Sequence, residues 1–249
     1  MDKNSTETHL VINDIHAPYY DDNLIKLVLK FARILKPDYL VNLGDSVDMP
    51  SISQFDRSPE RYTNLGQDFK AGYEINGRFA DAVKDAKRVY TKGNHCFRFE
   101  KYIMRHPEIS GAIDFEAKIG LKDFGYKIYE YGDFFKHNDF LFTHGHIIRK
   151  HSGYTAKAML DEIGTSGISG HTHRASAFYK TDLGGEKVWV ENGCLCDFDL
   201  AYQWFRQKSV NWNYAISVIT FHKDKFHIDQ IVIPRKHLFI IYGNKYYTL

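Results

Sequence analysis

The chain has 249 residues, which is long enough to bury a hydrophobic core that needs no disulfide bonds. Its 33 lysines and arginines nearly balance its 31 aspartates and glutamates, which argues against a protein held on DNA mainly by a dense basic surface. The three cysteines are odd in number and lack framework spacing, which favours free thiols in a reducing compartment.

The N-terminal residues are polar and lack the basic start and apolar core of a signal peptide. No apolar run approaches the roughly 18 residues that a membrane-spanning helix requires. These two features predict a soluble cytoplasmic protein without a membrane partner.

The first predicted elements form a β-α-β unit. Thr8 to Asn13 is a short apolar run that predicts a strand. From Asp22 to Leu35 apolar residues recur three and four positions apart, which predicts a helix with Asp21 or Asp22 as its cap and Pro37 closing it. Residues 39–43 predict a second strand, joined to the first by a right-handed crossover.

The remaining chain changes from helical to β-rich character near Tyr126. Before it we expect helices over 60–86, 97–106 and 113–119, and a strand over 88–92. After it we expect a meander of 126–131, 134–136 and 140–143, then a helix over 153–162. Further strands are expected over 167–169, 177–180, 187–191, 215–222 and 226–233.

The C-terminal residues predict a β-hairpin over about 238–248, because two apolar runs flank Gly243-Asn244. Its apolar and aromatic side chains predict that it packs on the sheet or pairs with another subunit, so a homo-oligomer stays open. Without an evident linker, we expect one domain over 1–249.

Five predicted strands end in polar side chains. The pairs are Asp14 and His16, Asp45 and Asp48, Asn94 and His95, His144 and His146, and His171 and His173. An isolated Gly44-Asp45 is typical of a turn with an acidic cap, but five such clusters favour chemistry. Carboxylate, amide and imidazole groups suit borderline divalent ions, and one bridging carboxylate can hold two ions about 3.5–4 Å apart. Strand alternation would point Asp14 and His16 to one side, and likewise His171 and His173.

The ordered blocks Asp-x-His, Gly-Asp-x-x-Asp, Gly-Asn-His, His-Gly-His and Gly-His-x-His cover residues 14–173. This set resembles the calcineurin-like metallophosphoesterase family. The resemblance implies an α/β fold, a four-layer α-β-β-α sandwich of two mixed β-sheets flanked by helices. It also implies two divalent metal ions, manganese first, with iron, zinc, cobalt and magnesium as alternatives.

The resemblance further implies roles for individual residues. Asp14, His16 and His173 would hold the first metal, Asn94, His144 and His171 the second, and Asp45 would bridge them. A hydroxide shared between the metals would attack phosphorus in line. His95 would protonate or stabilise the leaving group, and Asp48 would orient that imidazole. His146 would either contact substrate or support the ligand beside it.

Two positions depart from the family pattern. Met49 stands where many phosphomonoesterases of the family have a phosphate-binding arginine. Candidates for that task are Arg98, Arg149, Lys150, His151 and Arg174, although each also fits a solvated surface charge. Cys96 stands where an acidic residue often follows the Gly-Asn-His block, and we interpret it as a small buried residue.

The segment from Glu191 to Cys196, followed by Trp212-Asn213, resembles the tail of small phage-type members of the family, which would place the protein in a host cytoplasm. Residues 202–212 would then lie near the site, where an aromatic ring could stack on a base, with core packing as the alternative. Cys194 and Cys196 offer two thiolates to a soft metal, but two ligands do not make a zinc site. We interpret the histidines outside the motifs as hydrogen-bonded or exposed: His9, His106, His137, His222, His227 and His237.

The predicted function is metal-dependent hydrolysis of a phosphate ester. A small-molecule nucleotide, a nucleoside or deoxynucleoside 5'-monophosphate, is the preferred substrate because the chain is near-neutral and aromatic-rich. The alternative is a phosphodiesterase or an SbcD-type nuclease acting on nucleic acid, which Met49 would suit. A non-catalytic metal-binding scaffold is the third alternative.

Overall fold

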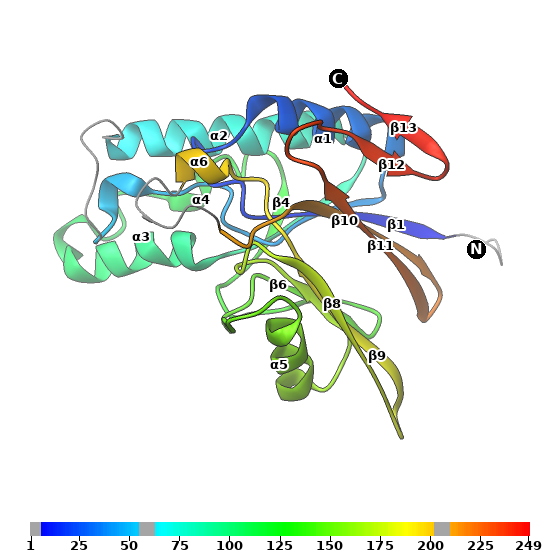
Figure 1. Ribbon diagram of the computed structural model, residues 1–249. Coiled ribbons are helices and arrows are strands. Elements are labelled where there is room, and N and C mark those ends of the chain that lie inside the picture. Colours follow the sequence, from blue (N-terminus) through cyan, green and yellow to red (C-terminus); the bar gives the residue numbers. More distant parts are fainter. Residues whose placement is uncertain (1–5, 55–62, 202–209) are drawn as a thin grey trace.

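Two β-sheets lie face to face in the computed structural model, which describes residues 6–54, 63–201 and 210–249. Helices cover the outer side of each sheet (Figure 1). The resulting order of layers is helix, sheet, sheet, helix.

The first sheet has the strand order β11-β10-β1-β2-β3-β4. Its strands are β1 (Glu7–Ile12), β2 (Tyr39–Asn42), β3 (Lys87–Thr91), β4 (Tyr126–Tyr129), β10 (Tyr214–His222) and β11 (Lys225–Ile233). Strands β1 to β4 are parallel, whereas β10 runs antiparallel to both β1 and β11. Because β4 pairs with β3, the predicted meander over 126–143 is wrong: the chain leaves the first sheet after β4.

The second sheet has the strand order β5-β6-β7-β9-β8. Its strands are β5 (Phe135–His137), β6 (Phe140–Thr143), β7 (Gly167–Ser169), β8 (Ala175–Asp182) and β9 (Gly185–Asn192). Strands β6, β7 and β9 are parallel, and the two edge strands run antiparallel to their neighbours. Both sheets are therefore mixed, as predicted.

Helices α1 (Asp22–Leu35) and α2 (Leu65–Ala82) lie side by side over the first sheet (Figure 1). Asp21 caps α1, because its side chain accepts hydrogen bonds from the backbone of Asn23 and Leu24. The other helices within the described residues are α3 (Asn94–Arg105), α4 (Phe115–Lys118), α5 (Tyr154–Ile163) and α6 (Phe198–Ala201), and 3₁₀ turns lie at Pro50–Ile52 and Pro107–Ile109. Helix α2 replaces the helix predicted over 60–86, whose residues 60–62 lie outside the described residues.

Three apolar layers separate these elements. Alternation along β1 sends Leu10 and Ile12 to the core beneath the helices, and Val11 to the core between the sheets. There Val11 joins apolar residues of the second sheet such as Phe142. A smaller core around Trp189 lies between the second sheet and α5. These layers confirm the predicted four-layer sandwich.

The predicted C-terminal hairpin consists of β12 (Ile240–Tyr242) and β13 (Lys245–Tyr247), which form a separate two-stranded sheet. It packs on helix α1, where the rings of Tyr242 and Tyr247 meet Phe31 at 5.6 and 5.2 Å between centroids. The hairpin thus packs on helix α1 and also contacts strand β11 of the first sheet, in agreement with the first of the two predicted alternatives. No helix among the described residues is long and apolar enough to cross a membrane.

Candidate metal centre

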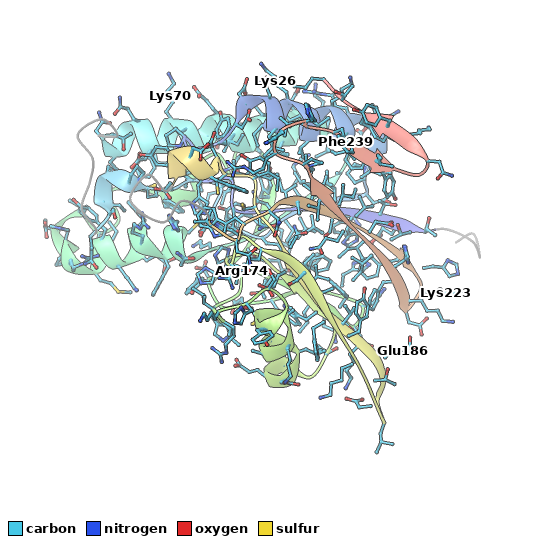
Figure 2. All side chains as sticks on the ribbon, viewed as in Figure 1. Lys26, Lys70, Arg174, Glu186, Lys223 and Phe239 are labelled. Carbon is cyan, nitrogen blue, oxygen red and sulfur yellow. The ribbon has the colours of Figure 1, made fainter. Side chains whose placement is uncertain are left out.

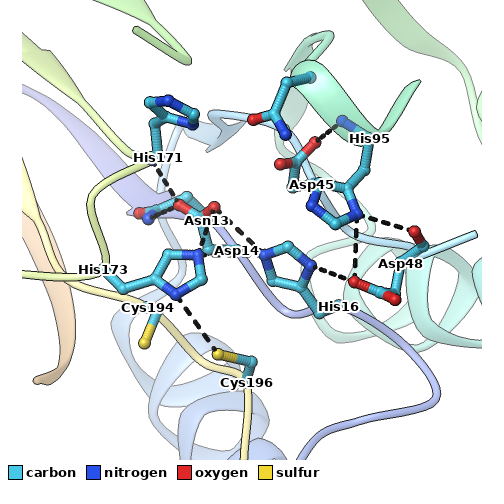
Figure 3. A network of polar contacts seen from close by, with 12 residues as sticks. Asn13, Asp14, His16, Asp45, Asp48, His95, His171, His173, Cys194 and Cys196 are labelled. Atoms are coloured by element: carbon cyan, nitrogen blue, oxygen red, sulfur yellow. Dashed lines mark hydrogen bonds and ion pairs between the residues drawn. The ribbon is translucent and has the colours of Figure 1, made fainter. Parts of the chain in front are cut away.

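Loops at the carboxyl ends of strands from both sheets bring the strand-end side chains together (Figure 3). The loop after β1 carries Asp14 and His16, and the loop after β2 carries Asp45 and Asp48. Asn94 and His95 begin α3, directly after β3. The second sheet contributes His144 after β6, and His171 and His173 after β7.

Five of these residues adopt left-handed backbone conformations that only glycine adopts freely: φ is 49° at Asp14, 53° at His16, 50° at Asp45, 70° at His171 and 60° at His173. Such conformations cost about 1–3 kcal/mol each, and surrounding contacts must hold them. Here neighbouring loops do so, since the backbone N–H groups of Asp14 and His16 donate to the carbonyls of Gly44 and Asp45 at 3.0 and 2.9 Å.

These conformations correct the predicted reason for the convergence. Asp14 and His16 do meet, with 3.4 Å between Oδ1 and Nε2, but left-handed turns rather than strand alternation bring them together. His171 and His173 contact different partners: the His171 ring lies 5.1 Å from that of His144, whereas His173 contacts Asp14.

The first group consists of Asp14, His16 and His173, all of them buried. His173 Nε2 lies 3.1 Å from Asp14 Oδ1 and 3.1 Å from His16 Nε2. Ligands bound to one ion at 2.0–2.2 Å, at angles from 90° to tetrahedral, are separated by about 2.8–3.6 Å. The three donors therefore fit a single divalent ion.

The second group surrounds His144. Its Nε2 lies 3.2 Å from Asp45 Oδ2 and 3.0 Å from Asn94 Oδ1, and the His171 ring stands beside it. The ligand atoms of Asp14, Asp45 and His144 all lie within 4.8 Å of one another, so Asp45 stands between the two groups.

Two glycines leave room for the carboxylates. A Cβ atom on Gly93 would overlap Asp45 Oδ1, and one on Gly170 would meet Asp14 Oδ2 at 2.5 Å. The backbone N–H groups of His95 and His171 donate to these same oxygens at 3.0 and 2.8 Å. Each carboxylate therefore lies directly against the main chain that carries the next ligand.

The charges at the site call for cations. Burial alone would raise the pKa of Asp14 and Asp45, but His173 and His144 outweigh it and hold both pKa values below their usual range. Burial disfavours a charged imidazole, yet Asp45 raises the pKa of His144 to about 9. Burial and the charge of His144 lower the pKa of His171 to about 4. Divalent ions would take over the neutralisation that protonated imidazoles provide, so the residues present fit metal binding.

Asp48 contacts two imidazoles (Figure 3). Its Oδ1 lies 3.1 Å from His95 Nδ1 and 3.0 Å from His16 Nδ1. Its backbone carbonyl also lies 2.7 Å from His95 Nδ1. The contact with His95 was expected, whereas the sequence offered no sign of the contact with His16. Asp48 thus orients a candidate metal ligand and the candidate proton donor together.

Of the candidate phosphate-binding residues, Arg98 is joined to this cluster: its Nη1 donates to the Asp48 carbonyl at 2.8 Å, and its Nη2 lies 3.4 Å from His95 Nε2. His146 is exposed and contacts Glu162 of α5 at 3.0 Å. Arg174, in the middle of Figure 2, donates from Nη1 to the carbonyl of the exposed Arg149. Lys150 and His151 are exposed.

A buried amide network behind Asp14 escaped sequence reasoning. Asn13 Nδ2 donates to Asp14 Oδ2, and Asn192 Nδ2 donates to Asn13 Oδ1 at 2.6 Å. Ser217 Oγ donates to Asn192 Oδ1 at 2.6 Å, so the network links the ligand to β9 and β10. Asn13, directly before Asp14 in the sequence, could have indicated such a network.

The role of Glu191, at the end of β9, was also not identified from the sequence. Its position as a lone acidic residue after the apolar run Val188–Val190 could have indicated a buried polar contact. Its carboxylate is fully buried and accepts from Thr172 Oγ1 at 2.7 Å, and Thr172 stands between His171 and His173. Its other oxygen accepts from Ser176 Oγ at 2.8 Å, Gly153 N at 2.9 Å and Ala156 N at 3.2 Å. Glu191 therefore ties the ligand loop to the beginning of α5.

Cys196 and Trp212 lie against the far side of His173. Cys196 Sγ is 3.9 Å from His173 Nδ1, and the Trp212 ring lies 4.3 Å from the imidazole. The thiols of Cys194 and Cys196 form a buried group of three candidate metal ligands with His173. Burial raises the pKa of Cys196 well above its usual value, so this thiol stays protonated at neutral pH and does not act as a thiolate ligand. Cys96 is fully buried, as predicted. The segment 202–209 lies outside the described residues.

Comparison with known proteins identifies a match to the family model of the calcineurin-like phosphoesterases over residues 8–243. The Gene 54 proteins of Mycobacterium phages D29 and L5 are 28% and 27% identical to this chain over 242 residues, covering 90% of it and 92% of their own length.

Solved structures with a related arrangement are more distant in sequence. Zinc-bound Vps29 from Entamoeba histolytica matches with a TM-score of 0.49 and 13% identity, covering 94% of this chain and 97% of its own. The phosphoesterase YfcE from E. coli matches with a TM-score of 0.43 and 14% identity, covering 91% of this chain and 100% of its own.

Proposed function

Because the chain belongs to the calcineurin-like phosphoesterase family, we propose that its strand-end cluster binds two divalent metal ions and removes phosphate from nucleoside or deoxynucleoside 5'-monophosphates. Family membership establishes the coarser activity, metal-dependent phosphoester hydrolysis. The observation that carries the proposal is the position of Asp45 between two groups of donors, one around His173 and one around His144.

In this proposal Asp14, His16 and His173 would hold one ion, Asn94, His144 and His171 would hold the other, and Asp45 would be shared between them. We propose manganese as the native metal, because carboxylate, amide and imidazole groups form a mixed set that suits such an ion. Bound ions supply positive charge for the phosphoryl oxygens and lower the pKa of water.

His95 donates a proton to the leaving oxygen. Asp48 holds its Nδ1 from two sides, the carboxylate at 3.1 Å and the carbonyl at 2.7 Å. The proton that His95 gives to the leaving oxygen is therefore carried on Nε2, and the contact of Arg98 with this nitrogen is given up when Nε2 is protonated. Arg98 stands 3.4 Å from that Nε2 and binds the phosphate in place of the arginine that Met49 replaces. The Arg98 guanidinium donates to the Asp48 carbonyl. Asp48 therefore positions both His95, the proton donor, and Arg98, the cation that binds the phosphate.

An aromatic pair beside the cluster supports a nucleotide as substrate. Tyr131 stacks on Phe97 at 5.3 Å and lies 6.4 Å from the His144 ring. Such rings stack on a base regardless of its identity. Trp212 lies behind His173 and packs on Phe198, so it belongs to the core there.

The alternative is a phosphodiesterase or nuclease of the SbcD type. The observation that favours it is Met49, which is fully buried at the position of the phosphate-binding arginine of many monoesterases. A diester carries less charge than a monoester and makes a smaller demand on such a cation.

The two candidates are separated by assaying the protein, with Mn²⁺, on deoxynucleoside monophosphates, bis(p-nitrophenyl) phosphate and linear DNA. We expect inorganic phosphate from the monophosphates and none in the same assay from Asp45→Asn. Cleavage of the diester and the DNA without release of phosphate from the monophosphates would replace the proposal with the alternative.

A further inference from the structure

A second set of metal-binding side chains lies at the opposite end of β1. Glu7 and His9 point to one face of this strand, and His137 reaches them from the end of β5 in the other sheet. Glu7 Oε1 lies 3.0 Å from His9 Nε2 and 3.0 Å from His137 Nε2. One carboxylate oxygen and two imidazole nitrogens thus converge here. The start of β1 lies near the N-terminus (Figure 1), at the opposite end of this strand from Asp14 and His16.

The buried member of this set has one ring nitrogen in the cluster and the other among aromatic rings. The His9 side chain is fully buried among Tyr39, Phe142 and Phe221, and its Nδ1 has no hydrogen-bond partner. Its polar contact is therefore the one that Nε2 makes with Glu7. Nε2 is thus the nitrogen that faces the cluster and would bind an ion.

Both imidazoles are suited to metal binding because they are neutral near pH 7. Burial and the neighbouring His137 lower the pKa of His9 to about 3, and burial also lowers the pKa of His137. Neutral imidazoles keep a lone pair for an ion, whereas a protonated pair would form only salt bridges with Glu7.

The charged groups around the set leave it able to accept a cation. Lys87 adds a positive charge nearby, but its Nζ is held by the hydroxyl of Tyr39 at 3.1 Å. Asp38 adds a negative charge, and its carboxylate accepts from the backbone of Thr8 at 2.7 Å. Glu7 and Asp38 together outnumber Lys87, so the local balance is negative.

The spacing matches that of ligands on one ion. Separations of about 3.0 Å arise when two ligands bind at 2.0–2.2 Å with an angle near 90° between them. Two imidazoles and one carboxylate are donors that suit zinc and similar borderline divalent ions. The Glu7 and His137 side chains are 36% and 19% exposed, which leaves access for an ion and for water on its open positions.

We propose that Glu7, His9 and His137 form a binding site for a borderline divalent cation, zinc being the best match. The ion would fasten β1 of the first sheet to β5 of the second. A direct tie already exists next to it, because Asn138 Nδ2 donates to the carbonyl of Lys223 in the β10–β11 turn, labelled in Figure 2. The site would extend this connection to the strand that leads into the candidate active site.

The test compares the zinc content of wild-type protein, Glu7→Gln and His137→Asn after equilibrium dialysis against micromolar zinc. Both altered side chains are partly exposed, so folding should survive, and circular dichroism verifies it. The matched control is His227→Asn, an exposed histidine of β11 that pairs with Asp229. We expect each cluster variant to bind one zinc equivalent fewer than wild type and the control to bind the same number.

A second measurement follows the melting temperature with and without zinc. An ion that binds only the folded state raises the melting temperature. We expect the zinc-induced rise in melting temperature to be smaller in the cluster variants than in the control. Equal zinc content in all four proteins, or a difference that emerges only at millimolar zinc, would overturn the proposal. Phosphoester hydrolysis should be unchanged in all of them, which keeps this test separate from that of the proposed function.

Discussion

Strand β1 has a carboxylate and an imidazole two residues apart at each end, yet the two ends are constructed differently. Glu7 and His9 lie within the strand, whereas Asp14 and His16 both lie beyond it in left-handed turns. At the start, ordinary alternation suffices to align the pair. At the end, hydrogen bonds from the backbone N–H groups of Asp14 and His16 to carbonyls of the loop after β2 hold the strained conformations. The same spacing in the sequence is therefore built by a regular strand at one end and by strained turns at the other.

The electrostatics of the two ends also differ. At the carboxyl end the buried Asp14 and Asp45 face several imidazoles, and the pKa of His144 rises to about 9. At the start, where Glu7 is partly exposed, burial lowers the pKa of His9 to about 3. Buried carboxylates outside a metal site would be costly, so the carboxyl end depends more on bound cations.

The largest difference between the two ends of β1 is expected when one carboxylate charge is removed beside each end. Asp45→Asn should reduce Mn²⁺-dependent hydrolysis to the background rate, because Asp45 stands between both donor groups. Glu7→Gln should leave the rate unchanged. The measurement is phosphate release at saturating Mn²⁺, with metal content determined on the same samples. Full activity in Asp45→Asn would show that this carboxylate does not bridge the metals.

Replacement of one imidazole should have the next largest effect. His95→Ala should lower the rate by about 10²–10⁴-fold, the usual contribution of a general acid, and should keep the bound metal. His137→Ala at the other end serves as the control for loss of an imidazole. If His95→Ala instead loses metal in proportion to activity, His95 is a ligand.

The smallest effect is expected from Glu191, which contacts the ligand loop only through Thr172. Glu191→Gln should weaken Mn²⁺ affinity by about 10–100-fold, as is common for groups that orient metal ligands. Excess Mn²⁺ should restore most of the rate, and the measurement is activity as a function of Mn²⁺ concentration.

Substitutions at Thr172 supply the control for that experiment. Thr172→Val removes the hydroxyl that Glu191 accepts from and should reproduce the defect, whereas Thr172→Ser should restore near-normal affinity. An unchanged Mn²⁺ dependence in both Glu191→Gln and Thr172→Val would mean that Glu191 supports α5 alone.

Local features accounted for most of the elements. Helix α1 was predictable because its apolar face, its cap Asp21 and the following Pro37 all act within a few residues. The assignment of β4 and β5 to one meander failed because pairing partners are chosen by distant segments. Short apolar runs report that a strand exists and carry no information about its sheet.

The sequence by itself determined the order of the strand-end motifs, because that order depends only on residue type and spacing along the chain. The family resemblance that these motifs carry then implied the layered α/β fold. Only the tertiary structure decided that Asp48 contacts His16 as well as His95, that Glu191 secures Thr172, and that His9 meets His137. These partners lie on different strands and loops, up to 128 residues apart for the last pair. Such contacts exist only after both sheets have packed, and packing rather than any local pattern selects them.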